Sequence, residues 1–169
     1  MEGYRSVLAT IAGRARPMCH EATCTLECRP VAVRAGRAFI AERLCEWGVV
    51  TSDSAYERLS DVLLATSELL TNAVKFCNDQ QQLVLDVRAH RDEIRIAVTD
   101  PEPAPAVPRR RGPYDEGGRG LALVEAVTDR WGQDRNDRSK TVWFAVGVPD
   151  GSALARGCKS QYLSSSAGP

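Results

Sequence analysis

The spacing of hydrophobic residues along the chain switches between two periods, and each switch marks a change of secondary structure. Segments in which apolar residues recur at every second position, or in which apolar and β-branched residues dominate, predict strands. In the clearest case, two such segments are joined by a short polar turn, which predicts an antiparallel hairpin. The predicted strands cover residues 20–28, 83–89, 94–99, 131–135 and 141–148.

Helical spacing, with apolar residues three and four positions apart, predicts three helices over residues 30–48, 52–77 and 121–132. Ser52, Asp53 and Ser54 are suitable caps for the start of the middle helix. That helix is the longest, and one of its faces is apolar apart from a threonine. The residues of this face are Leu59, Val62, Leu63, Thr66, Leu70, Ala73 and Cys77.

The predicted order is strand, helix, helix, strand, strand, loop, helix, strand, strand. Helices that cluster between hairpins, instead of alternating singly with strands, favour an α+β fold. We therefore expect a two-layer α/β sandwich in which helices cover one face of a mixed, mostly antiparallel sheet. The loop at 101–118 is rich in proline and glycine, and a loop of this length is typical of a lid or a binding loop.

The length of 169 residues predicts one domain, which we place at residues 19–149. Residues 1–18 show little periodicity and are predicted to form a flexible arm. Residues 150–169 are rich in glycine and serine and are predicted to form a disordered tail.

Charge and hydropathy narrow the function classes. Lysine plus arginine equals aspartate plus glutamate, at 22 each, which argues against direct nucleic-acid binding as the main function. No apolar run approaches the roughly 20 residues that span a bilayer, so we expect a cytoplasmic protein without a membrane segment.

The six cysteines are expected to be reduced thiols, because the chain shows no secretory signal and two of them occupy helical apolar positions. Cys19, Cys24 and Cys28 lie close together in the sequence, beside His20. Their spacing does not match the usual zinc-binding pairs. A zinc- or redox-sensing site there remains a weaker alternative.

The middle helix carries a polar face opposite its apolar one. Glu68 and Asn72 are four residues apart and therefore share this face, with Thr71 and Lys75 nearby. A carboxylate can orient or deprotonate a hydroxyl, an amide oxygen can ligate Mg²⁺, and an ammonium can neutralise a phosphate charge. The alternative is that these side chains only face solvent.

Two further polar features lie at the ends of elements. Asp100 ends an apolar strand, where its carboxylate can accept a hydrogen bond from an exocyclic amine such as that of adenine. Gly117, Gly118 and Gly120 lead into the third helix, and such a turn lets backbone N–H groups approach an anion. The simpler alternatives are a strand-ending turn residue and a flexible helix entry.

Four segments together resemble the Bergerat-fold (GHKL) ATPases. Glu68-Leu-Leu-Thr-Asn72-Ala resembles the N box, and Val98-Thr-Asp100 resembles the strand that enters the G1 box. Gly118-Arg-Gly-Leu-Ala-Leu-Val124 resembles the G2 region, and Lys140-Thr-Val-Trp-Phe144 the last strand. Within this superfamily the chain is most similar to the small anti-sigma-factor serine kinases of actinobacteria.

The resemblance implies a role for each matching residue. Glu68 would be the general base, Asn72 the Mg²⁺ ligand, and Asp100 the partner of the adenine amine. The loop at 101–117 would be the ATP lid. The remaining residues implied to lie by the nucleotide are Lys75, Gly118, Arg119, Gly120, Leu121 and Thr141.

The implied function is that of an ATP- and Mg²⁺-binding anti-sigma factor. It would phosphorylate a serine of a small anti-sigma antagonist, and would bind the sigma factor as a homodimer. A non-catalytic module that sequesters a regulatory protein is the alternative. It is favoured by the prolines that replace the usual glycines after Asp100, and opposed by the intact pair of Glu68 and Asn72.

Overall fold

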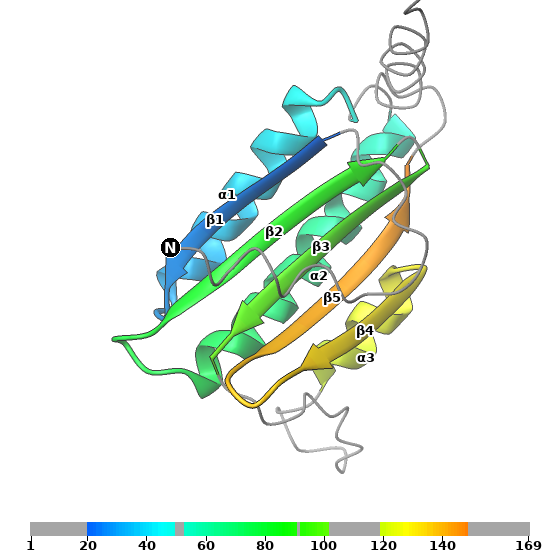
Figure 1. Cartoon of the computed structure of the whole chain (residues 1–169). Helices are drawn as coiled ribbons and strands as arrows, with labels where there is room; N and C mark the ends of the chain where they lie inside the picture. The colour runs from blue at the N-terminus through cyan, green and yellow to red at the C-terminus, as the bar shows by residue number, and fades with distance from the viewer. Residues whose placement is uncertain (1–19, 50–52, 91, 102–118, 149–169) are drawn as a thin grey trace, which may run out of the picture.

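The computed structural model describes residues 20–49, 53–90, 92–101 and 119–148, and these form two layers (Figure 1). Five strands make one sheet, and the three described helices all lie on the same side of it. The strands are β1 (His20–Glu27), β2 (Gln82–His90), β3 (Glu93–Asp100), β4 (Arg130–Arg135) and β5 (Lys140–Gly147). The helices are α1 (Val31–Glu46), α2 (Asp53–Phe76) and α3 (Arg119–Val127). The predicted α+β sandwich is confirmed.

The sheet has the strand order β1-β2-β3-β5-β4, and each of its four neighbouring pairs is antiparallel. The mixed character allowed for in the prediction does not occur among the described strands. The β3–β5 register places Asp100 opposite Lys140 and Thr99 opposite Thr141. Successive side chains of a strand point to opposite faces, so these two pairs lie on opposite sides of the sheet.

The core lies between the sheet and the helices. Leu83, Leu85 and Val87 of β2 are fully buried, as their alternation predicted. On α2, the predicted apolar face is largely confirmed, and Ala65 and Leu69 extend it. Thr66 is buried there, and its hydroxyl donates to the Val62 carbonyl at 2.7 Å.

Helix α1 approaches α2 and the sheet closely because residue 36 is glycine. A Cβ at Gly36 would lie 2.4 Å from Cδ1 of Leu70 and 3.1 Å from Cδ2 of Leu85. Arg37 is exposed, and its guanidinium donates to the Ser67 hydroxyl at 2.6 Å. The two helices are thus joined by a close apolar contact and a polar one.

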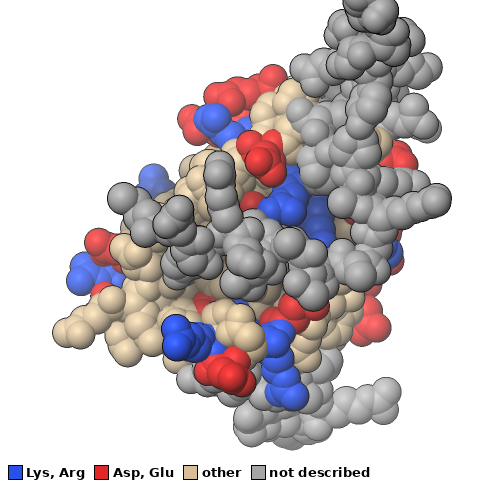
Figure 2. Space-filling model, viewed as in Figure 1, with Lys and Arg blue, Asp and Glu red and all other residues tan. Residues whose placement is uncertain are grey.

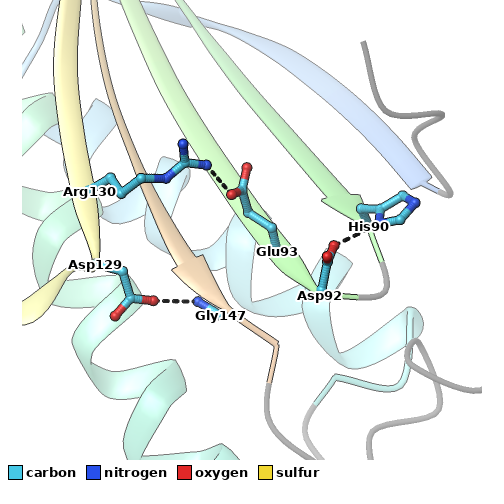
Figure 3. Close-up of polar contacts among 6 residues, drawn as sticks. All are labelled: His90, Asp92, Glu93, Asp129, Arg130 and Gly147. Atoms are coloured by element: carbon cyan, nitrogen blue, oxygen red, sulfur yellow. Dashed lines mark hydrogen bonds and ion pairs between the residues drawn. The ribbon is translucent and has the colours of Figure 1, made fainter. Parts of the chain in front are cut away.

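The predicted third helix was too long. It ends at Val127, and residues 130–135 form β4 instead of continuing the helix. Pairing with β5 stops the helix, because the Asp129 backbone N–H donates to the Ala145 carbonyl at 3.1 Å. The Asp129 carboxylate also accepts from the Gly147 N–H at 2.6 Å, and Arg130 pairs with Glu93 (Figure 3).

The expectation of reduced thiols was wrong for one pair, because Cys28 and Cys77 form a disulfide. Cys28 follows β1 and Cys77 follows α2, and the chain folds these two ends together with their Cα atoms 6.0 Å apart. Cys28 is therefore not a free thiolate for the alternative zinc site. The described residues contain no group of three or more potential metal ligands, and Cys19 lies outside them.

Charged side chains of both signs are interspersed on the sheet face opposite the helices, in agreement with the neutral composition (Figure 2). On this helix-free face, Arg88 pairs with Asp86 at 2.9 Å and Arg95 lies 3.9 Å from Asp134. No helix among the described residues is long and apolar enough to cross a membrane. The predicted arm, the predicted tail and all of the predicted loop at 101–118 except residue 101 lie outside the described residues.

Candidate functional site

One face of α2 carries three residues at four-residue intervals: Glu68, Asn72 and Phe76. Glu68 and Asn72 are partly buried, whereas Phe76 is 51% exposed. With a rise of 1.5 Å per residue, Glu68 and Phe76 are about 12 Å apart along the helix axis. Each end of this row lies against a different element of the fold, so the row has two chemically distinct ends.

At the Glu68 end, the carboxylate lies against the first turn of α3. A Cβ added to Gly120 would be 2.6 Å from Oε2 of Glu68, so only glycine leaves room for this contact. Unpaired backbone N–H groups and the positive end of the helix dipole gather at such a helix start. The start of α3 therefore favours a negatively charged group, such as the Glu68 carboxylate itself or a phosphate.

The residues predicted around the glycine turn have different surroundings in the structure. Arg119 begins α3, and Gly120 touches Glu68, whereas the Leu121 side chain is buried in the core. Leu121 can contribute to a ligand site only through its backbone. Gly118 lies outside the described residues.

At the Phe76 end, Asp100 and Lys140 form a buried ion pair. Nζ of Lys140 is 3.4 Å from Oδ2 of Asp100, and the two side chains are 2% and 1% exposed. The same ammonium lies 5.8 Å from the centre of the Phe76 ring, and the Lys75 ammonium lies 5.9 Å from that ring. The end of α2 and the ends of two strands therefore meet around an acidic and a basic group.

The sequence analysis placed Thr141 by the nucleotide and did not single out its neighbour Lys140. The Thr141 hydroxyl lies 2.8 Å from that of Thr99, on the helix-free face, so the structure does not bring it together with Asp100. The sequence held a signal for Lys140, because it is in phase with the inward residues Val142 and Phe144. A lysine in that phase is buried and needs a partner.

The donor set fits a Mg²⁺ ion shared with phosphates. Mg²⁺ prefers oxygen ligands, keeps several waters, and is usually held by one or two protein groups plus substrate phosphates. Asn72 offers an amide oxygen, and Glu68 offers a carboxylate one turn away. Glu68 lies against the start of α3, where phosphates are favoured, and Asn72 lies in the middle of the row.

Comparison with known proteins identifies a family and a fold. A family model described as "Histidine kinase-like ATPase domain" matches residues 26–146, which is more than half of the chain. An uncharacterized protein of Streptomyces coelicolor is 51% identical over 58 residues, covering 32% of this chain and 55% of the relative. This chain thus spans about half the length of that curated relative.

A solved structure shares the fold. It is the crystal structure of the RsbU and RsbW domains of Rv1364c from Mycobacterium tuberculosis, which matches with a TM-score of 0.53 and 22% identity. The match covers 77% of this chain and 33% of that one. At this identity the likeness concerns the fold alone.

Proposed function

The chain belongs to the family of histidine kinase-like ATPase domains, and we propose that within it the protein is an ATP- and Mg²⁺-binding anti-sigma factor. In this proposal it phosphorylates a serine of a small anti-sigma antagonist and so regulates transcription by partner switching. It acts in the cytoplasm as a homodimer. The motif resemblance of residues 68–73, 98–100, 118–124 and 140–144 supports the subtype, beyond what the family match states.

The observation that carries the proposal is that the two ends of the row Glu68, Asn72 and Phe76 on α2 differ chemically. One end presents Glu68 beside the start of α3, where phosphates are favoured, and Asn72 follows one turn along α2. The other end presents a buried acid and base that can hydrogen-bond to a nucleobase. A nucleoside triphosphate has the same two ends, with a base at one end and phosphates at the other.

Each residue then has a stated role. Glu68 orients or deprotonates the attacking serine hydroxyl, and Asn72 ligates Mg²⁺ beside the phosphates. The backbone of Gly118, Arg119 and Gly120 holds the phosphate oxygens. The predicted role of Lys75 in neutralising phosphate charge is not part of this arrangement, because its ammonium lies by the Phe76 ring at the other end of the row. Asp100 accepts from the adenine amine. Catalysis of phosphoryl transfer needs mainly positioning and charge stabilisation, which this arrangement of groups could supply.

Glu68→Ala tests the catalytic role. The variant should lose phosphorylation of a serine-bearing antagonist by at least a hundredfold, because general-base catalysis contributes about 10²–10⁴-fold. ATP affinity should change little. Glu57→Ala is the matched control, since Glu57 is an exposed carboxylate of the same helix, and it should behave as the wild type. Undiminished transfer by Glu68→Ala would remove this residue from the mechanism.

Asn72→Ala tests the metal role by calorimetric titration of ATP with and without Mg²⁺. The wild type should bind ATP more tightly with Mg²⁺, and the variant should lose that difference while it keeps its metal-free affinity. An equal Mg²⁺ effect in both proteins would show that Asn72 is not a ligand.

A second candidate function is a non-catalytic module that sequesters a regulatory protein. The Asp100–Lys140 pair favours it, because the carboxylate has a charge partner without any nucleobase. Incubation with ATP and the antagonist separates the two functions. Only the kinase leaves phosphoserine on the antagonist, whereas a module would capture its partner equally well without nucleotide.

A further inference from the structure

We propose that Lys140 determines nucleobase specificity by reading the base jointly with Asp100. The inference rests on the proposed nucleotide-binding function and goes beyond it, because it assigns a second base-contacting residue. Asp100 would accept a hydrogen bond from the adenine amine. Lys140 would donate a hydrogen bond to the neighbouring ring nitrogen N1.

The position of Lys140 is fixed by the sheet. It pairs directly with Asp100 in the antiparallel register of β3 and β5, and both side chains point to the helix-covered side. Their charged atoms are 3.4 Å apart, and the Phe76 ring at the end of α2 lies 5.8 Å from the ammonium. A ligand that contacts the Asp100 carboxylate therefore also lies close to the Lys140 ammonium.

The hydrogen-bonding capacities of the pair are complementary to one edge of adenine. An ionised carboxylate only accepts, and an ammonium only donates, through three N–H bonds. Adenine presents a donor, its exocyclic amine, next to an acceptor, N1. A carboxylate has about four lone-pair sites, so Asp100 can accept from the amine while it stays paired with Lys140.

Burial makes this pair selective. A base without N1 would leave one N–H bond of the buried Lys140 ammonium without an acceptor, although the ammonium stays paired with Asp100, and an unsatisfied buried donor is unfavourable. Sites that hydrogen-bond their ligand therefore reject analogues that lack the matching atom. If Lys140 served only as a counter-ion for Asp100, the affinity for a base would not depend on N1.

The test is calorimetric titration of the wild type and Lys140→Met with ATP and with 1-deaza-ATP, in which a C–H group replaces N1. The wild type should bind ATP at least tenfold more tightly than 1-deaza-ATP, because a hydrogen bond to a charged group contributes about that factor. Lys140→Met should bind both with similar, weaker affinity. Purine riboside triphosphate, which lacks the amine, gives the corresponding measurement for Asp100.

Two further variants control for unfolding and for the removal of a cation from an ion pair. Lys140→Met leaves a buried carboxylate without its cation, which can unfold the protein. Thermal melting checks this, and the neutral double variant Lys140→Met/Asp100→Asn replaces the single one where it does not fold. Arg130→Met is the control, because it removes the cation of another sheet ion pair, with Glu93 at the opposite end of β3.

The outcomes separate the two proposals. An N1 preference that is unchanged in Lys140→Met would overturn the inference and leave ATP binding intact. Tighter ATP binding by Lys140→Met would also overturn it, because Lys140 would then occupy the place of the base. Tighter binding of GTP than of ATP by the wild type would refute the assignment of adenine. A folded wild type that binds no ATP would refute the proposed function itself.

Discussion

The disulfide between Cys28 and Cys77 should contribute a large part of the stability of this domain. It joins the end of β1 to the end of α2 across 49 residues of sequence. In the chain-entropy description, closing a loop of this length removes about 4 kcal/mol of conformational freedom from the unfolded state. A domain of this size shifts its melting temperature by about 3 °C for each kcal/mol. Reduction should therefore lower the melting temperature by about 12 °C.

Thermal unfolding of the wild type with and without dithiothreitol measures this shift. The same pair of melts on Cys28→Ala/Cys77→Ala isolates the contribution of this bond, because reductant should then have a much smaller effect. Cys45→Ala is the matched control, since Cys45 is a free and exposed cysteine of α1, and it should melt as the wild type does.

Two results would refute the reasoning. One is a melting temperature of the wild type that does not change on reduction. The other is a non-reducing peptide map of the oxidised protein that shows no peptide linking Cys28 to Cys77. A shift equal in the wild type and in the double alanine variant would assign the effect to other cysteines.

Two further predictions concern close contacts, and a third concerns a partly buried thiol. Gly120→Ala should slow phosphoryl transfer by about a hundredfold because it displaces the Glu68 carboxylate, and its melting temperature should stay near that of the wild type. In a Glu68→Ala background it should cause no further loss of activity, and additive losses would contradict the contact. Gly36→Ala should destabilise by about 1–2 kcal/mol in urea unfolding, because overpacking against Leu70 outweighs the gain in helix propensity, and a double-mutant cycle with Leu70→Ala should show coupling. Burial raises the pKa of the Cys24 thiol, so iodoacetamide at pH 8 should alkylate it more slowly in the folded protein than in urea; equal rates would contradict the shift.

Most of the fold could be predicted from the sequence because its strands and helices have strongly periodic hydrophobic patterns. The alternation in β2 and β3 fixed both the hairpin and the face that packs against α2. The end of α3 could not be predicted in this way. Leu121, Val124 and Val127 continue a helical spacing towards Trp131, and only pairing with β5, which is distant in sequence, ends the helix.

The candidate site was predictable where its residues lie on one element and not where separate elements meet. Glu68 and Asn72 share a face of α2 by spacing alone. The approach of Glu68 to Gly120 and the disulfide between Cys28 and Cys77 depend on segments that only the folded chain brings together. No local pattern encodes such contacts.

Lys140 shows what a residue's phase in a strand can add to a motif. The motif resemblance drew attention to Thr141, but alternation along β5 places that side chain on the helix-free face. One residue earlier, the same alternation turns Lys140 towards α2 and opposite Asp100. An ammonium is costly to bury unless it is paired. Lys140, an inward lysine across from an inward aspartate, is therefore the feature that should distinguish the proposed base site from a site in which a carboxylate alone contacts the base.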